Sequence, residues 1–178
     1  IQAEVKKIAD SLYGNISSPE LSLFNSCKDF NIKYFENITA RLGSHFDGYI
    51  FESEAGVVGG ELVRENSPKI FTESEGAVVY IPAEADKHLN TAVFINSQGN
   101  PTYEAKDLGL LKMKFDKYNP DVSVFVTDYQ QAPHFAVVLD AAKKIDNKWF
   151  ENSHHIGHGR MSFKGQKMSS RLGGVPLA

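Results

Sequence analysis

The sequence has a single cysteine and no long hydrophobic run, and each shortage excludes a class of protein. Cys27 has no partner, so an internal disulfide and a zinc site built from cysteines are both excluded. No segment approaches the ~18 apolar residues that a membrane-spanning helix needs, and the first residues lack the pattern of a secretion signal. We therefore expect a cytoplasmic protein with no membrane partner.

The sequence also lacks an excess of positive charge, since its net charge is −3. This balance argues against binding nucleic acid by bulk electrostatic attraction. The basic residues are nevertheless concentrated near the carboxyl end. From Asp146 onward, the acids are Asp146 and Glu151, whereas the basic residues are Lys148, Arg160, Lys164, Lys167 and Arg171. This end is therefore the part of the chain best suited to phosphate chemistry.

Internal repeats and low-complexity tracts are absent too, and 178 residues suffice for one domain with a real core. We expect a single domain over residues 1–178. Apolar spacing and cap signals predict helices over residues 1–13, 19–42, 57–65, 103–118 and 132–144. β-Branched and aromatic runs predict strands over residues 49–51, 77–81, 92–96 and 122–126, the last buried on both faces. This alternation predicts an α/β fold with an open, mostly parallel sheet flanked by helices.

Polar residues follow several of the predicted strands. In open α/β sheets ligands bind beyond the carboxyl ends of the strands, so these side chains are expected to line a pocket. They are Glu52 after the first strand, Tyr103 and Asp107 after the third, and Gln131 and His134 after the fourth.

Tyr103 and Asp107 are four residues apart and would share one face of a helix. An aromatic ring beside a carboxylate suits a cationic ligand such as a guanidinium. From these two residues alone, the alternative is the simpler interpretation: Asp107 caps or solvates the first turn while Tyr103 packs in the core.

Residues 164–174 form a candidate phosphate-binding loop. Basic side chains, adjacent hydroxyls and paired glycines suit phosphate oxygens; the loop contains Lys167, Met168, Ser169, Ser170, Arg171, Gly173 and Gly174. A solvated basic turn is the alternative.

Motifs in a fixed order resemble those of arginyl-tRNA synthetases. Residues 41–53 lead through Phe-Asp to a Glu-Ser pair, as in that family. Residues 101–107 resemble its Thr-Tyr-x-x-Arg-Asp motif, with Lys106 in place of the arginine, and residues 126–135 are similar to its Val-x-Asp-x-x-Gln-x-x-His-Phe element. Residues 167–171 match its Lys-Met-Ser-Ser-Arg form of the class I signature. The resemblance implies half of a Rossmann-like class I synthetase catalytic domain.

The resemblance also implies roles for individual residues. Arginine would be held by Glu52, Tyr103, Asp107 and Gln131. The ATP-binding residues would be His134, His155, His158, Lys167 and Met168, and the catalytic loop would contribute Lys167, Ser169, Ser170 and Arg171. Mg²⁺ would be expected with ATP, without a site built from protein ligands alone.

His155-Ile-Gly-His158 spells the other class I signature, but it lies too close to Lys167 to be that element. We expect residues 157–159 to form a turn and the histidines to line or brace the loop. A metal site made of His154, His155 and His158 is the alternative. Its spacing is permitted on a helix, but two nearby glycines disfavour a helix and no strong acid ligand follows.

The implied activity is ATP-dependent activation of L-arginine and its transfer to tRNA(Arg) by a monomeric enzyme. Because the chain starts at Ile1 and lacks the upstream signature, we expect part of a larger enzyme, inactive by itself. The alternative is a catalytically inactive synthetase-like binding module, suggested by Lys106 and Ser170, where the family carries arginine and often lysine.

Overall fold

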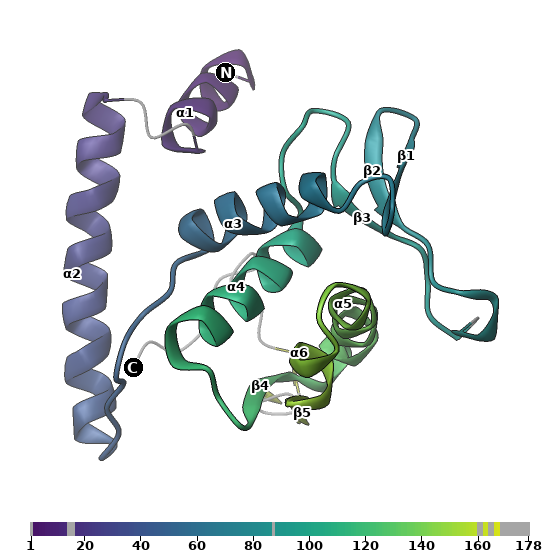
Figure 1. The fold of residues 1–178 in the computed structure, drawn as a ribbon. Helices are drawn as coiled ribbons and strands as arrows, with labels where there is room; N and C mark the ends of the chain where they lie inside the picture. The colour runs from purple at the N-terminus through teal and green to yellow at the C-terminus, as the bar shows by residue number, and fades with distance from the viewer. Residues whose placement is uncertain (1, 14–16, 87, 160–161, 164–165, 168–178) are drawn as a thin grey trace. The chain divides into compact units, whose positions relative to one another are not determined.

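The structure is a computed structural model that describes residues 2–13, 17–86, 88–159, 162–163 and 166–167. Figure 1 shows its helices and strands along the chain. The contacts divide the chain into two compact units, the first ending at Tyr49 and the second beginning at Ile50. The single domain expected over residues 1–178 stays a prediction. None of the described helices is both long enough and apolar enough to cross a membrane.

The first unit contains two helices, α1 (Gln2–Tyr13) and α2 (Pro19–Arg41). The start of α2 is the one predicted: the Ser18 hydroxyl accepts the Leu21 N–H at 3.1 Å, which satisfies a free donor of the first turn. Beyond the helix, the ring of Phe46 stacks against Phe35 with centroids 5.6 Å apart. The chain therefore turns back along α2 after the helix ends.

The second unit contains the remaining elements, and together they confirm the α/β class. In order they are α3 (Glu52–Glu65), β1 (Phe71–Ser74), β2 (Ala77–Tyr80), η1 (Glu84–Asp86), β3 (Ala92–Ile95), α4 (Tyr103–Tyr118), β4 (Ser123–Asp128), η2 (Tyr129–Gln131), α5 (Ala132–Ile145), α6 (Asn147–Glu151), β5 (Ser153–His158), β6 (Ser162–Phe163) and β7 (Gln166–Lys167).

The described strands are not mostly parallel, which corrects that part of the predicted fold. Only β4 and β5 pair in parallel, with Ser123 opposite Ser153; β1–β2–β3 and β6–β7 are antiparallel. The reason lies in the β1–β2 connection, where Glu75 and Gly76 have φ angles of 51° and 78°. Two consecutive left-handed residues form a tight hairpin turn, which forces antiparallel pairing.

The strand predicted over residues 49–51 is wrong. Phe51 has extended dihedrals (φ −91°, ψ 149°), but it precedes α3 as its N-terminal cap residue. Its backbone N–H donates to the Glu54 carboxylate at 3.2 Å, so it is held by the helix and not by a neighbouring strand. Glu52 therefore begins a helix, where its carboxylate is favoured by the helix dipole.

Helices α3 and α4 pack with their backbones in close approach (Figure 1). A Cβ atom added at Gly59 would overlap the carbonyl oxygen of Ala105, and one added at Gly109 would overlap that of Ala55. Glycine is needed at both positions because any side chain would separate the helices. This contact fixes where the first turn of α4 lies relative to the start of α3.

Aromatic rings fill the core beside α4. Phe71 of β1 lies 4.9 Å from Phe94 of β3 and 5.9 Å from Tyr80 of β2, measured between ring centroids. Tyr80 donates its hydroxyl to the buried Asp140 carboxylate of α5 at 2.6 Å. Burial, with this hydrogen bond, raises the pKa of Tyr80 above its ordinary value. The three-stranded sheet is thereby tied to α5.

Strand β4 is buried on one face only, which corrects the predicted burial on both. Ser123 and Phe125 point into the core, whereas Val124 and Val126 are 40% and 64% exposed. Alternate residues of a strand face opposite sides, and β5 pairs along the edge of β4 without covering the outer face.

Replacing Tyr80 with Phe should lower the free energy of unfolding by about 1–3 kcal/mol, because it leaves the buried Asp140 carboxylate without its donor. Urea denaturation measures the change. The control is Tyr118→Phe, whose ring is half exposed and whose loss of a hydroxyl should have little effect. Equal stabilities for the two variants would contradict the assigned hydrogen bond.

Candidate functional site

Asp107, one of the residues expected to bind arginine, pairs with His134. The two lie on α4 and α5, and His134 Nε2 is 2.6 Å from Asp107 Oδ2. The other ring nitrogen, Nδ1, lies 3.6 Å from a carboxylate oxygen of Glu104, one turn earlier on α4. The hydrogen bond to Asp107, together with the nearby Glu104 carboxylate, raises the pKa of His134 to about 9. His134 is therefore an imidazolium near neutral pH.

Glu52 and Tyr103 are connected by Lys106. The Lys106 ammonium lies 3.0 Å from Glu52 Oε2 and 5.2 Å from the centroid of the Tyr103 ring. Lys106 is largely buried, whereas the Glu52 carboxylate is mostly exposed. Lys106, which stands where the family motif has arginine, thus places its ammonium between the Tyr103 ring and the Glu52 carboxylate.

The simpler interpretation of Tyr103 and Asp107 is wrong on both counts. Tyr103 is 68% exposed and so does not pack in the core, and the Asp107 carboxylate bonds to His134. A hydrogen bond to β3 holds the start of α4 in place, because the Thr102 hydroxyl donates to the Val93 carbonyl at 2.6 Å. Both side chains are therefore presented by a rigid helix start.

Gln131 lies at the end of η2, directly before α5, with an exposed side chain. The turn that carries it is closed by Asp128, whose carboxylate accepts the Gln130 N–H at 2.9 Å. Gln131 precedes His134 by one helical turn, so it lies at the end of α5 that faces Asp107. Its contact with arginine stays a prediction.

His155 and His158 lie in strand β5, so the turn predicted over residues 157–159 is wrong up to His158. His155 Nε2 is 2.7 Å from the Thr127 hydroxyl, and its ring stacks on Phe135 with centroids 4.7 Å apart. This segment forms a strand, although it contains Gly157, because it pairs along its length with β4.

The geometry of β5 does not support the alternative metal site made of His154, His155 and His158. His154 and His158 fall on one face of β5 and His155 on the other, because side chains alternate. In the described ranges, no three His, Cys, Asp or Glu side chains are grouped to hold a metal.

The predicted catalytic loop falls mostly outside the described residues. Lys167 ends β7, where it pairs with Ser162 of β6. Met168, Ser169, Ser170 and Arg171 lie outside the described residues, and so do Gly173 and Gly174.

Sequence reasoning missed Glu104 and gave Lys106 no role in the site. A signal was present for Glu104, since it precedes Asp107 by three residues and shares its helix face. Nothing in the sequence indicates that one histidine bridges both acids. His134 contacts the carboxylate expected to bind arginine, and its predicted place near the nucleotide stays a prediction.

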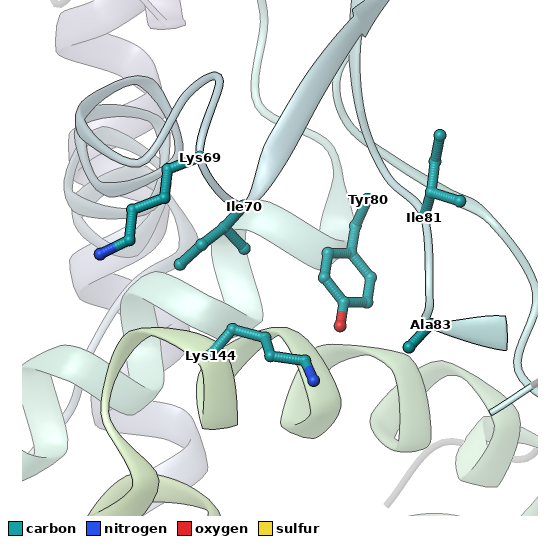
Figure 2. A pocket seen from close by; sticks show the side chains of 6 residues that line it. All are labelled: Lys69, Ile70, Tyr80, Ile81, Ala83 and Lys144. Atoms are coloured by element: carbon teal, nitrogen blue, oxygen red, sulfur yellow. The ribbon is translucent and has the colours of Figure 1, made fainter. Parts of the chain in front are cut away.

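A pocket of about 340 Å³ lies elsewhere, and Figure 2 shows it between the start of β1, the end of β2 and the carboxyl end of α5. It has an apolar floor and two lysines, and none of the predicted site residues lines it. The lining residues are Lys69, Ile70, Tyr80, Ile81, Ala83 and Lys144.

Residues 60–177 match the family model described as tRNA synthetases class I (R), catalytic domain, which defines a class I tRNA synthetase catalytic domain. The chain is 30% identical to the arginine–tRNA ligase of Clostridium perfringens over 158 residues. It is 30% identical to that of Lactobacillus johnsonii over 165 residues. The chain belongs to the arginyl family of class I tRNA synthetase catalytic domains.

The matches also show how much of those proteins the chain represents. They cover 88% and 90% of this chain but only 28% of either relative. The fold is similar to the crystal structure of arginyl-tRNA synthetase from Plasmodium falciparum, with a TM-score of 0.73 and 22% identity. That likeness covers 89% of this chain and 28% of the other, and it confirms the Rossmann-like class I fold.

Proposed function

We propose that this chain is the arginine-binding part of an arginine–tRNA ligase catalytic domain. The intact protein activates L-arginine with ATP and transfers it to tRNA(Arg). The observation that supports this most is the cluster at the start of α4, where acidic and aromatic side chains surround cations. Lys106 lies against Glu52 and Tyr103, and His134 lies against Asp107.

The chemistry of this cluster suits arginine in particular. A guanidinium is planar and always charged, so a carboxylate can hold it by paired hydrogen bonds while a ring covers its face. Asp107 and Glu52 supply the carboxylates, and the exposed Tyr103 supplies the ring. Gln131, at the nearby end of α5, adds an amide that can donate to the substrate carboxylate or accept from its ammonium.

In the proposed reaction, the arginine carboxylate attacks the α-phosphorus of ATP and pyrophosphate leaves. The protein contributes positioning and charge neutralisation, not covalent chemistry. The loop residues Lys167, Ser169, Ser170 and Arg171 contact the phosphates, with His155, His158 and Met168 beside them. We expect Mg²⁺ to arrive with ATP, held mainly by phosphate oxygens, and we expect the intact protein to be a cytoplasmic monomer.

Arginine-dependent exchange of pyrophosphate into ATP tests the proposal. The intact protein should catalyse it with L-arginine but not with citrulline, which has the same shape without the charge. This chain alone should not catalyse it. Absence of exchange by the intact protein, together with retained arginine binding, would instead support the inactive binding module.

Replacing Lys167 with Ala in the intact protein should slow adenylate formation by about 100-fold or more, because one donor to the developing phosphate charge is lost. Single-turnover kinetics measure this step. Lys112→Ala is the control, since Lys112 forms an ordinary helix-surface ion pair with Asp116. A rate unchanged by Lys167→Ala would remove the loop from the mechanism.

A further inference from the structure

We propose that His134 is a positioning residue of the arginine site: its imidazolium holds the Asp107 carboxylate and loses its proton when a cationic group of the substrate takes that carboxylate. The inference rests on the proposed function, because it concerns the same carboxylate. It assigns His134 to the amino-acid side of the site, whereas the family resemblance implies a role near ATP.

The geometry favours a doubly protonated ring in the protein without substrate. Nε2 lies 2.6 Å from Asp107 Oδ2, and Nδ1 lies 3.6 Å from Glu104 Oε1. A neutral imidazole has one N–H and one lone pair, so it would turn its lone pair toward one of the two carboxylates. Only the imidazolium presents an N–H to each. Glu104 therefore favours the charged form that Asp107 binds.

The remaining surroundings of His134 in the described residues supply no competing cation. The ring of Phe135 stands edge-on to it with centroids 5.2 Å apart. His155 of β5 lies against the Phe135 ring at 4.7 Å and bonds through Nε2 to the Thr127 hydroxyl, so it is directed elsewhere. The charged groups that set the pKa of His134 are Asp107 and Glu104, and they raise it to about 9.

Binding of arginine changes this balance. A guanidinium or ammonium at Asp107 places a second positive charge beside the imidazolium, which lowers the pKa of His134. Below pH 9 the substrate-free ring is protonated, so binding releases up to one proton to solvent. Arginine affinity should therefore rise with pH, by up to tenfold per unit, until the pH approaches 9.

Calorimetric titration of L-arginine into the intact protein tests this, in buffers of different ionisation enthalpy between about pH 6.5 and about 8.5. At the low end of this pH range, we expect a fraction of a proton to be released per arginine bound. The number should approach one at pH values where the His134 ring is protonated without arginine and deprotonated with arginine bound. In His134→Gln the amide still donates to Asp107, so binding should persist while the proton release and the pH dependence fall. His88→Gln, at an exposed position outside the site, should behave as the wild type.

Titration of the ligand's own amino group is common to all three proteins and cancels in their differences. Arginine binding with the same proton release in the wild type and in His134→Gln would overturn the inference and leave the proposed function standing. Absence of arginine binding by the wild type would overturn both. The wild-type proton count does not depend on whether the variant folds: a count of zero at every pH would also refute the inference.

Discussion

Replacing Asp107 with Asn in the intact protein should weaken L-arginine binding by about 30-fold to 3,000-fold, as expected when one partner of a desolvated charge pair is removed. The substrate's cation then loses its carboxylate, and the amide nitrogen of Asn adds a donor that faces it. The half-buried site cannot replace the lost charge with bulk water. Calorimetric titration of arginine, or the KM for arginine in pyrophosphate exchange, measures the change.

Asp116→Asn provides the matched control. Asp116 lies on the same helix α4 and loses the same charge, but its carboxylate is exposed and pairs with Lys112 at 2.6 Å. Surface pairs of this kind contribute little. Arginine affinity should stay within about twofold of the wild type. If Asp107→Asn also left affinity unchanged, Asp107 would not be part of the arginine site.

Replacing Gly59 or Gly109 with Ala should lower the free energy of unfolding by about 2 kcal/mol or more. Each new Cβ would overlap a backbone carbonyl of the facing helix, that of Ala105 or Ala55 respectively. Backbone cannot move aside as a flexible side chain can, so α3 and α4 must separate. This cost exceeds the gain of about 1 kcal/mol that Ala brings to a helix interior. Chemical denaturation of this chain measures the difference.

Gly56→Ala is the control within the same helix. Its Cβ would lie 3.5 Å from a Pro101 side-chain atom, which is ordinary van der Waals contact. The helix propensity of Ala should then dominate, and stability should stay level or rise by up to about 1 kcal/mol. Comparable losses at Gly56 and Gly59 would show that the close approach of the two helices is not what requires glycine.

Local signals predicted the helices best. The bounds of α4 coincide with the prediction, Tyr103–Tyr118, because apolar spacing and flanking turn residues agree there. The start of α2 was predicted from Ser18 and Pro19, which satisfy the first turn without help from elsewhere. Such features depend on residues close in sequence, which a sequence displays directly.

Pairing and packing were predicted poorly because they depend on distant residues. Strand β1, Phe-Thr-Glu-Ser, carries no strand pattern of its own and is formed by its hairpin with β2. Glycine lowers helix propensity, yet Gly59 is the place where α4 approaches α3 most closely, which the sequence does not show. Likewise, the motifs predict Glu52, Tyr103 and Asp107 as site residues, but the cations that lie against the two acids are visible only in the fold.

The central claim is that the acids and the ring at the start of α4 bind the amino-acid substrate. A crystal structure of the intact protein with bound L-arginine tests it most directly. We expect a cationic group of arginine within hydrogen-bonding distance of the Asp107 carboxylate, beside the Tyr103 ring and Glu52. Arginine bound elsewhere, with Lys106 still on Glu52 and His134 still on Asp107, would contradict the account.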